Sequence, residues 1–377
     1  MNVVIYAHYQ PPAPSASATR MLSLARHLRS LGHHVTLLTS MAGPSEVEGF
    51  PVARVAGRLG LLRWLRNTPP CPIFVSSPPA TPAAEVAWAA RALGHQVMVD
   101  IRDPSVIEAI KQQEFKPGLA TRVKGWLEQS LPRAGLVVSF VSETLRDEFA
   151  GFANFTPQHT VIAPNGVDLS IFQWGPSSFA EGRRLLGLGD EPLFAYQGIL
   201  GGKELDKVVA ALGPALSRGA RLLVVGIVDA HSLPIKDALH DQLRAMGLLD
   251  QLIWRENLSL PQMAKLLPAV DIGVNPLPLD RSYCLPVKTY EYMAAGCYNL
   301  AHGAATGALK QQLPAYAGEV ATSWVDYCVR AQELAAAVVE LRQGQVERVE
   351  AAQQFSRQTA NERIAEALLK LSKPKEA

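Results

Sequence analysis

The chain has 377 residues, of which 48% are hydrophobic and 19% charged, a composition typical of a globular protein with sizeable cores. This length exceeds what a single core usually supports, so two domains are expected. The 36 basic and 34 acidic residues leave a net charge of only +2, which gives no electrostatic basis for general binding of nucleic acid.

The sequence indicates neither a disulfide framework, nor a metal centre, nor a membrane span. No apolar run approaches the ~18 residues that a membrane-spanning helix needs, and the opening MNVVIYAHY lacks the positive region of an export signal. The cysteines lack the CxxC spacing of a structural zinc site, which fits a reducing compartment: Cys71, Cys284, Cys297 and Cys328. We therefore predict a cytoplasmic protein.

Apolar runs typical of buried parallel strands alternate with helical patterns through the first half of the chain. Strands are predicted at residues 2–6, 35–39, 73–77, 96–101, 135–140 and 160–163. This alternation predicts a doubly wound parallel sheet, and such sheets bind ligands at the carboxyl ends of their strands.

Two groups of residues are expected at that edge. The loop after the first predicted strand contains Ser15, Ala16 and Ser17, small residues that permit close approach of a ligand, although such a loop can also be a simple connection. Asp100, Arg102 and Asp103 lie where the strand at 96–101 ends and could position an acceptor or a leaving group. A surface ion-pair cluster is the competing interpretation.

The segment at residues 54–66, RVAGRLGLLRWLR, interleaves four arginines with leucines and a tryptophan. A basic amphipathic segment of this kind can lie on an anionic membrane surface. Packing of an ordinary helix on the core is the alternative, and the shortness of the segment favours it.

The second half of the chain repeats the alternation of strands and helices. The pair Asn165-Gly166 indicates a turn, and residues 171–191 have little apolar periodicity, so we expect a linker there. Strands are predicted at 193–197, 222–226, 252–254, 272–275 and 298–301, which indicates a second doubly wound domain. A helical stretch at 346–371 could pack on this domain or cross back to the first.

A glycine-rich turn, YQGILGGKELDKV, follows the first strand of the second half. Gly198, Gly201 and Gly202 would let backbone N–H groups approach a pyrophosphate, and Lys203 would neutralise it. Turns of this kind also occur without a ligand.

The stretch LPVKTYEYMAAG at residues 285–296 predicts a short helix. Pro286 suits the first helical position and Gly296 the position just past the end. Lys288 and Glu291 are three residues apart and therefore share one face. Helix N-terminal amides with a lysine bind phosphate well, and a carboxylate accepts hydrogen bonds from sugar hydroxyls, a combination that suits a nucleotide sugar. A solvated ion pair on an ordinary helix is the alternative.

With these pieces in order, the chain resembles the retaining glycosyltransferases of family 4, which have the α/β GT-B fold of two Rossmann-like domains facing across a cleft. The resemblance runs through nearly the whole chain and rests on YQPP followed by SASATR, VDIRDP, SFVSETLRD, IAPNGVD, YQGILGGKELDKV and PVKTYEYMAAG. It implies an acceptor-binding domain at 1–170, a linker at 171–191 and a donor-binding domain at 192–355. The helix at 356–377 would cross back to the first domain.

The resemblance also implies transfer from a nucleotide-diphosphate sugar with retained configuration, and neither a cofactor nor a required metal. The transferred group would be a hexosyl or N-acetylhexosaminyl unit, as in polysaccharide biosynthesis. The acceptor would be a glycan, a lipid-linked molecule or a small molecule, and a lipid-linked acceptor would bring peripheral contact with the inner membrane surface.

Site residues carry over by position. Glu291 would hydrogen-bond the donor ribose, Lys203 would contact the diphosphate, and residues 283–286 would present backbone amides. The expected donor site comprises Gly198, Gly201, Gly202, Lys203, Tyr283, Cys284, Leu285, Lys288 and Glu291. The expected acceptor loop comprises Ser15, Ala16, Ser17 and Arg20, and the expected catalytic residues are Asp100, Arg102, Asp103 and Lys203.

The chain departs from the family pattern at three places. The family commonly has two glutamates spaced E-x7-E, but Tyr283 stands eight residues before Glu291. The opening loop has Ser15 and Ala16 where the family usually has a glycine pair, and residues 199–202 lack the usual arginine. Two rival functions therefore stay open: a nucleotide-sugar epimerase of the same architecture, and a GT-B protein with weakened catalysis that binds its ligand.

Overall fold

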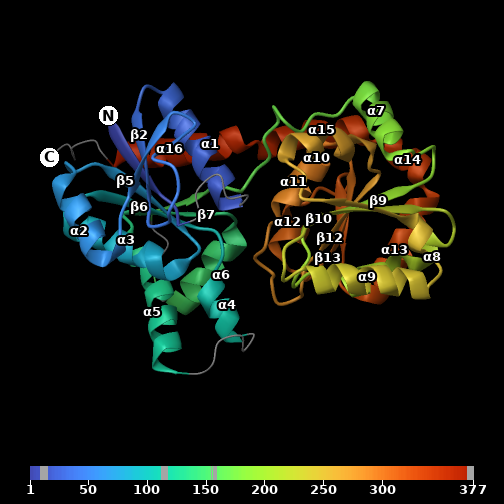
Figure 1. The fold of residues 1–377 in the computed structure, drawn as a ribbon, viewed down its shortest axis with the longest axis horizontal. Helices are drawn as coiled ribbons and strands as arrows, with labels where there is room; N and C mark the ends of the chain where they lie inside the picture. Colours follow the sequence, from blue (N-terminus) through green and yellow to red (C-terminus); the bar gives the residue numbers. More distant parts are fainter. Residues whose placement is uncertain (9–15, 112–117, 154, 156–158, 372–377) are drawn as a thin grey trace. The chain divides into compact units, whose positions relative to one another are not determined.

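The computed structural model describes residues 1–8, 16–111, 118–153, 155 and 159–371. The chain divides into two compact units (Figure 1). The first unit consists of Met1–Asn165 with Arg357–Ala377, and the second unit of Gly166–Ser356. Each unit is built on a largely parallel sheet, so the predicted α/β class with two Rossmann-like domains is confirmed.

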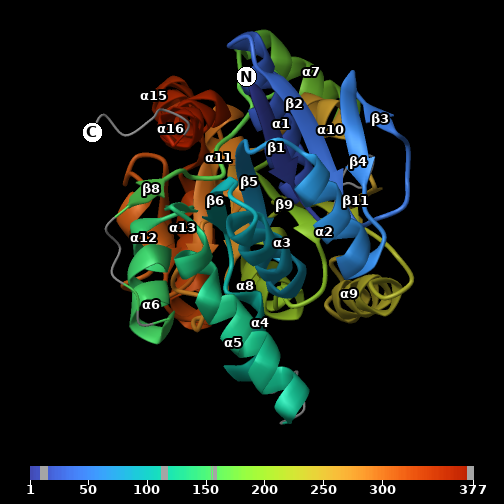
Figure 2. The same cartoon turned by 90° about the vertical axis from the view of Figure 1, so that its left-hand side faces the viewer.

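The sheet of the first unit has the strand order β3-β4-β2-β1-β5-β6-β7-β8 (Figure 2). All of its neighbouring strands are parallel except β3 and β4. The order reverses at β1, which lies between β2 and β5, and a ligand site of a doubly wound sheet is expected at such a reversal. The strands are β1 (Asn2–Tyr6), β2 (His34–Thr39), β3 (Glu46–Val47), β4 (Phe50–Arg54), β5 (Pro72–Ser77), β6 (Gln96–Ile101), β7 (Val137–Phe140) and β8 (Thr160–Ile162), and the helices are α1 (Ala16–Ser30), α2 (Gly57–Asn67), α3 (Ala80–Ala92), α4 (Ser105–Lys111), α5 (Leu119–Ala134), α6 (Glu143–Ala153) and α16 (Arg357–Lys370).

The C-terminal helix α16 completes the core of the first unit. It packs on α1, and the side-chain amide of Asn361 donates a hydrogen bond of 2.7 Å to the Ser23 hydroxyl. Ile364 and Leu368 are fully buried in the same apolar cluster as Ile5 of β1. The two ends of the chain therefore belong to one folding unit.

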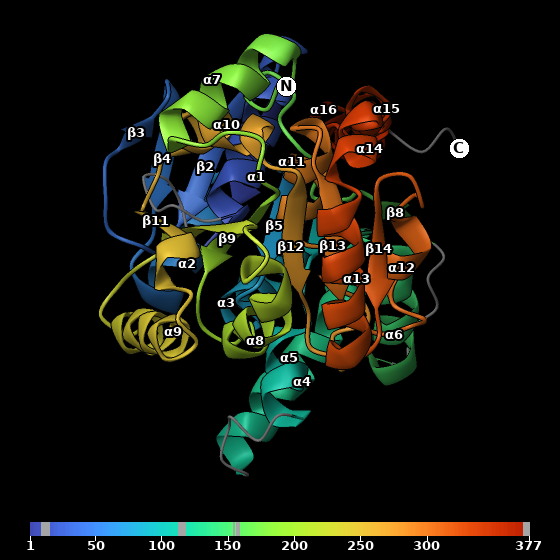
Figure 3. The same cartoon turned by 90° about the vertical axis from the view of Figure 1, so that its right-hand side faces the viewer.

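The sheet of the second unit has the order β11-β10-β9-β12-β13-β14 and is parallel throughout (Figure 3). Its order reverses at β9, between β10 and β12. The strands are β9 (Leu193–Ile199), β10 (Arg221–Ile227), β11 (Leu252–Glu256), β12 (Ile272–Pro276), β13 (Tyr298–His302) and β14 (Gly318–Ala321). The helices are α7 (Pro176–Leu186), α8 (Leu205–Leu216), α9 (Leu233–Ala245), η1 (Leu249–Gln251), α10 (Leu260–Leu266), η2 (Leu267–Ala269), α11 (Val287–Ala294), α12 (Ala308–Gln312), α13 (Trp324–Ala336), α14 (Val338–Gln343), α15 (Gln345–Ala352) and η3 (Gln353–Phe355).

The helix α11 sits so close to this sheet that a strand residue must be glycine. A Cβ atom added at Gly273 of β12 would lie 2.3 Å from the ring of Tyr292, which is a forbidden distance. The Tyr292 hydroxyl donates a hydrogen bond of 2.9 Å to the carbonyl of Ala195 in β9. The helix is thereby fixed against the two strands at which the strand order reverses.

The expected linker at 171–191 is wrong. These residues contain α7, which packs against η2 and α10 of the second unit. A Cβ atom added at Gly182 would lie 2.8 Å from the Cβ of Ala269, so α7 and η2 are in close contact. The first unit also ends earlier than expected, at Asn165 rather than at residue 170.

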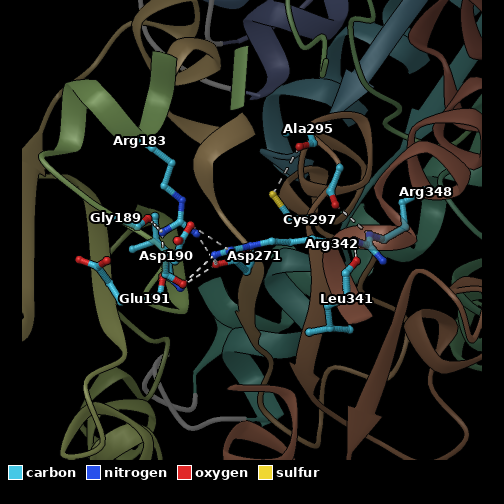
Figure 4. A network of polar contacts seen from close by, with 12 residues as sticks. Arg183, Gly189, Asp190, Glu191, Asp271, Ala295, Cys297, Leu341, Arg342 and Arg348 are labelled. Atoms are coloured by element: carbon cyan, nitrogen blue, oxygen red, sulfur yellow. Dashed lines mark hydrogen bonds and ion pairs between the residues drawn. The ribbon is translucent and has the colours of Figure 1, made fainter. Parts of the chain in front are cut away.

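A buried aspartate ties α7 and α14 to the sheet of the second unit (Figure 4). Asp271, which is fully buried just before β12, accepts a hydrogen bond of 2.5 Å from Arg183 and one of 2.8 Å from Arg342. The backbone N–H of Leu193 donates a third, of 2.9 Å. This carboxylate is therefore fully engaged in holding the fold.

We expect Asp271→Ala to lower the free energy of unfolding by about 3 kcal/mol, because it leaves Arg183 buried without its counter-charge. Glu181→Ala is the matched control: it removes the ion pair with Arg184, both of whose side chains are exposed on α7, and should cost less than about 1 kcal/mol. Urea denaturation of both variants measures the difference. Equal losses would contradict the structural role of Asp271.

Candidate functional site

The helix α11 carries the charge pair predicted from the sequence. Its N-cap is Pro286, so the expectation that proline occupies the first helical position is wrong by one residue. Gly296, just past the C-cap, has φ +78°, a conformation that glycine adopts without strain. Every side chain from Thr289 to Ala294 is buried, so the helix is enclosed on nearly all sides.

Glu291 and Lys288 lie together against the carboxyl end of β9. The side-chain amide of Gln197 donates a hydrogen bond of 2.7 Å to Glu291 Oε2. Lys288 Nζ lies 3.9 Å from the centre of the Tyr196 ring, a cation–π contact. A Cβ atom added at Gly198 would lie 3.7 Å from the same Nζ. The two charged side chains therefore meet the last buried residues of the strand at the point where the order reverses.

The Lys288 ammonium group is held where its charge is poorly compensated. The pKa of Lys288 is lowered to about 7, mainly by burial and also by the positive charge of Lys203, while Glu291 opposes both effects. An anion bound beside the two lysines would restore the charged form. This electrostatic arrangement suits a phosphate group.

The glycine-rich turn after β9 adopts the backbone conformations that favour glycine. Gly198 has φ +119° and Gly202 has φ +65°, while Gly201 lies between them without a positive φ. Lys203 follows at the start of α8 and is partly buried. A pocket of about 370 Å³ opens between this turn and α9, and its lining includes Gly202, Lys203, Leu205, Ile235 and Gln242.

The loop before α11 offers less than the sequence suggested. Tyr283 and Leu285 are buried, and the Leu285 side chain belongs to an apolar cluster with Leu277 and Ala301. The backbone N–H of Cys284 already donates a hydrogen bond of 3.1 Å to the carbonyl of Arg281. The Cys284 amide is therefore not available to a ligand in this conformation, which corrects that part of the prediction.

In the first unit, Asp100 and Arg20 form an internal ion pair. Arg20, expected in the acceptor loop, lies in α1 and donates hydrogen bonds of 3.1 and 2.9 Å to the fully buried Asp100. The Ser139 hydroxyl donates a further one of 2.7 Å to Asp100. Both side chains are enclosed and engaged in structure, so the prediction that they contact substrate needs correction.

Arg102 and Asp103 continue from the same strand edge. Arg102 Nε donates a hydrogen bond of 3.2 Å to the Ser76 hydroxyl and lies 3.8 Å from Asp100 Oδ2. Burial lowers the pKa of Arg102 to about 10, and the negative charge of Asp100 opposes this effect. Asp103 is partly buried. Of the two predicted aspartates, Asp100 is thus fully buried and Asp103 only partly so.

The predicted acceptor loop falls mostly outside the described residues. Ser15 lies outside them, Ala16 is the first residue of α1, and Ser17 is buried in that helix. Among the described residues, no cluster of histidine, cysteine, aspartate or glutamate has the arrangement of a metal site. In the part of the chain that the structure describes, no helix is both long and apolar enough to cross a membrane.

Two polar residues near the predicted sites were not predicted from the sequence. Gln197 is the fifth residue of a strand that otherwise reads as apolar, and only its contact with Glu291 shows its importance. Glu128 of α5 is fully buried and accepts hydrogen bonds from the N–H groups of Val106 (3.1 Å) and Ile107 (2.7 Å) at the start of α4. It therefore holds the segment that follows Asp103.

The comparisons with known proteins concern the fold and the first unit. Residues 15–166 match the family model described as a glycosyl transferase 4-like domain. Sucrose-phosphate synthase from Thermosynechococcus elongatus is 16% identical, with a TM-score of 0.76, over 98% of this chain and 98% of that one. HepE from Anabaena, solved in complex with UDP, is 16% identical, with a TM-score of 0.79, over 98% of this chain and all of that one.

A third structure, WaaG, described as a glycosyltransferase involved in lipopolysaccharide biosynthesis, is 15% identical, with a TM-score of 0.70, over 97% of this chain and 99% of that one. No curated protein matches the chain. These likenesses define the class: the chain has the GT-B fold of glycosyltransferases. Residues 15–166 form a glycosyl transferase 4-like domain, which confirms the resemblance to family 4.

The lowered pKa of Lys288 predicts a pH-dependent stability. Between its ordinary pKa of 10.5 and its folded value of about 7, the unfolded chain binds more protons at this side chain, so the penalty for burying it grows as the pH falls. We expect the unfolding free energy of the wild type, relative to Lys288→Met, to rise by about 1–2 kcal/mol from pH 7 to pH 9. Denaturant titrations at the two pH values measure this, and parallel behaviour of the two proteins would contradict it.

Glu128 predicts the opposite slope. Burial raises the pKa of Glu128 to about 7, and the hydrogen bonds from Val106 and Ile107 lower it only in part. The folded protein therefore holds this proton longer than the unfolded chain, and its contribution to stability is present below pH 4.5 and is lost as the pH rises through 7. Glu128→Gln should flatten the decline in unfolding free energy between pH 5 and pH 8, by about 2 kcal/mol. An unchanged slope would show that Glu128 does not titrate there.

Proposed function

We propose that the chain is a retaining glycosyltransferase that moves a sugar from a nucleotide-diphosphate sugar to an acceptor. The observation that carries this proposal is the meeting of Lys288, Glu291 and Gly198 at the carboxyl end of β9, with Lys203 in the turn that follows. The glycosyltransferase fold and domain support it. Further support comes from HepE of Anabaena, which was solved in complexes with UDP and with UDP-glucose.

The two lysines serve the leaving group. As the glycosidic bond breaks, negative charge grows on the departing diphosphate, and groups already positioned beside it stabilise the transition state more than the ground state. Lys203 and Lys288 repel one another in the free protein, so a bound diphosphate would offset this electrostatic repulsion. A positioned donor to such a charge is worth about 3 kcal/mol, which makes this the dominant contribution.

Glu291 serves the nucleoside. Its Oε2 atom is held by the Gln197 amide, which fixes the orientation of the carboxylate. The carboxylate would then accept hydrogen bonds from the donor ribose, each worth about 1.5–3 kcal/mol because the acceptor is charged.

The acceptor would be held by the first unit, and Asp103 is the residue proposed to orient it. The departing phosphate can itself take the proton of the acceptor hydroxyl, so the reaction needs neither a protein base nor a metal or cofactor. The acceptor is a glycan, a lipid-linked molecule or a small molecule, and the transferred group a hexosyl or N-acetylhexosaminyl unit. The enzyme would accordingly act in polysaccharide biosynthesis in the cytoplasm.

A second function, binding of the donor without transfer, is favoured by one observation. Tyr283 occupies the position where the family commonly has a glutamate, and it is buried with a side chain that carries no charge. The carboxylate near the donor sugar is then missing. An epimerase of the same architecture is separated from both by its conversion of the donor in the absence of acceptor.

The experiment begins with calorimetric titration of UDP and of UDP-, GDP- and ADP-sugars. For the donor that binds, Lys203→Ala, Lys288→Met and Glu291→Gln should each weaken binding about tenfold or more, since each removes a charged contact worth roughly 1.4 kcal/mol or more. Lys265→Ala, an exposed lysine of α10 in the same unit, is the matched control and should bind normally.

Transfer is then followed by release of the nucleoside diphosphate in the presence of acceptor extracts, with the anomeric configuration of the product read by NMR. Binding without release in any extract would favour the binding protein. If none of the three site variants weakens donor binding, the donor does not bind at the proposed site.

A further inference from the structure

A second pocket of the second unit lies at the edge of its sheet, between α12 and the edge strand β14. It has a volume of about 360 Å³, and its lining includes Lys310 of α12, Glu319 and Val320 of β14, and Tyr298 at the start of β13. Helix α12 contacts β14, as Figure 3 shows. The pocket beside the glycine-rich turn is lined instead from α8 and α9, so the two pockets are separate.

The edge pocket contains one side chain of each charge. The exposed Lys310 side chain forms no ion pair with any described residue. Glu319 Oε2 lies 3.9 Å from Arg330 Nε, and Arg330 also pairs with Asp326 at 3.5 Å and with Glu333 at 2.9 Å. Burial raises the pKa of Glu319, the two other carboxylates raise it further, and Arg330 and Lys310 oppose these effects. One guanidinium group therefore serves three carboxylates, which leaves Glu319 able to take up another cation.

The edge strand adds a peptide group to the pocket. The Asn299 N–H donates a hydrogen bond of 2.9 Å to the Ala317 carbonyl, and the Gly303 N–H donates one of 3.1 Å to the Ala321 carbonyl. Because backbone groups alternate along a strand, the N–H and C=O of Val320 point away from β13, toward the outer edge. The side chains of Val320 and Leu313 supply an apolar surface beside them.

These groups together define the chemistry of a ligand. A cation and an anion stand on either side of an exposed strand edge, which offers one N–H donor and one C=O acceptor. A peptide-like molecule with both ends charged matches all of them: its carboxylate pairs with Lys310, its ammonium group pairs with Glu319, and a small apolar side chain covers Leu313. The volume lies in the range of pockets that hold small molecules.

Helix α12 connects the edge pocket to the loop before α11. The N–H of Ala308, the first residue of α12, donates a hydrogen bond of 2.6 Å to the Ser282 carbonyl of that loop. Leu309 of α12 and Val320 of the pocket belong to one small apolar cluster with Leu285. A ligand that holds α12 against β14 therefore acts on the same packed group as the loop.

We propose that the edge pocket binds a small zwitterion, an amino acid or a dipeptide with both ends charged, and that its occupancy is transmitted through α12 to the loop before α11. The binding and the transmission concern this unit alone. Only their consequence, a regulated affinity for the sugar donor, rests on the proposed function.

Binding is tested with a panel of amino acids and dipeptides, screened by saturation-transfer NMR and titrated by calorimetry. For the ligand that binds, its N-acetylated form and its C-amidated form each lack one charge and should bind about tenfold more weakly. Lys310→Glu and Glu319→Gln should have similar effects while keeping the melting temperature of the wild type. Their matched controls, Lys265→Glu and Glu340→Gln, change exposed residues elsewhere in the second unit and should bind as the wild type does.

The comparison of amino acids with dipeptides identifies which of the two the pocket takes. A panel without a binder, blocked forms that bind as well as the unblocked ligand, or two pocket variants that bind it unchanged would each overturn the proposal.

Transmission is tested without any sugar donor, by the alkylation rate of the Cys284 thiol in the loop before α11, followed by mass spectrometry. The saturating ligand should slow this reaction about fivefold, because it holds α12 and the apolar cluster in place. Cys328, which packs against a different apolar cluster, is the internal control and should react at an unchanged rate. An unchanged rate at Cys284 with ligand bound overturns the transmission. Slowed alkylation in a protein that binds no sugar donor supports this inference and counts against the proposed function alone.

Discussion

One buried contact, between Glu291 of α11 and Gln197 of β9, organises the polar chemistry of the second unit. The amide fixes the carboxylate, and the helix then places Lys288 one turn earlier, over the Tyr196 ring. Both charges are thereby held beside a strand end, where burial and, to a lesser degree, the positive charge of Lys203 lower the pKa of Lys288. A site that is electrostatically incomplete in this way is prepared for an anion.

The two units share a doubly wound topology but differ in the charged groups at the edge of the sheet. In each, the strand order reverses beside a central strand, at β1 and at β9. At the edge of the first unit, the charged residues satisfy one another: Asp100 is enclosed by Arg20 and Ser139. At the edge of the second, two cations repel each other across a glycine-rich turn. The charged groups at the two sheet edges therefore differ in how far their charges are already matched within the unit.

Local patterns in the sequence predicted the fold class and some of the local geometry of α11 and of the glycine-rich turn. Helical spacing correctly put Lys288 and Glu291 on one face, and two glycines of the turn have the positive φ that glycine allows. Contacts between distant residues were not predictable. The partners Arg20 and Asp100 are 80 residues apart, and Gln197 and Glu291 are 94 apart, so no local periodicity relates them. Helix α7 was missed because close packing at Gly182, rather than an apolar stripe, holds it in place.

The return of α16 to the first unit has a consequence for biosynthesis. The second unit is one continuous stretch, residues 166–356, so all of it is synthesised before α16. The first unit, although it begins the chain, lacks Ile364 and Leu368 from its apolar cluster until the last helix has been made. The apolar cluster of the first unit therefore stays incomplete until the whole second unit has been synthesised, so the first unit cannot finish folding ahead of that synthesis.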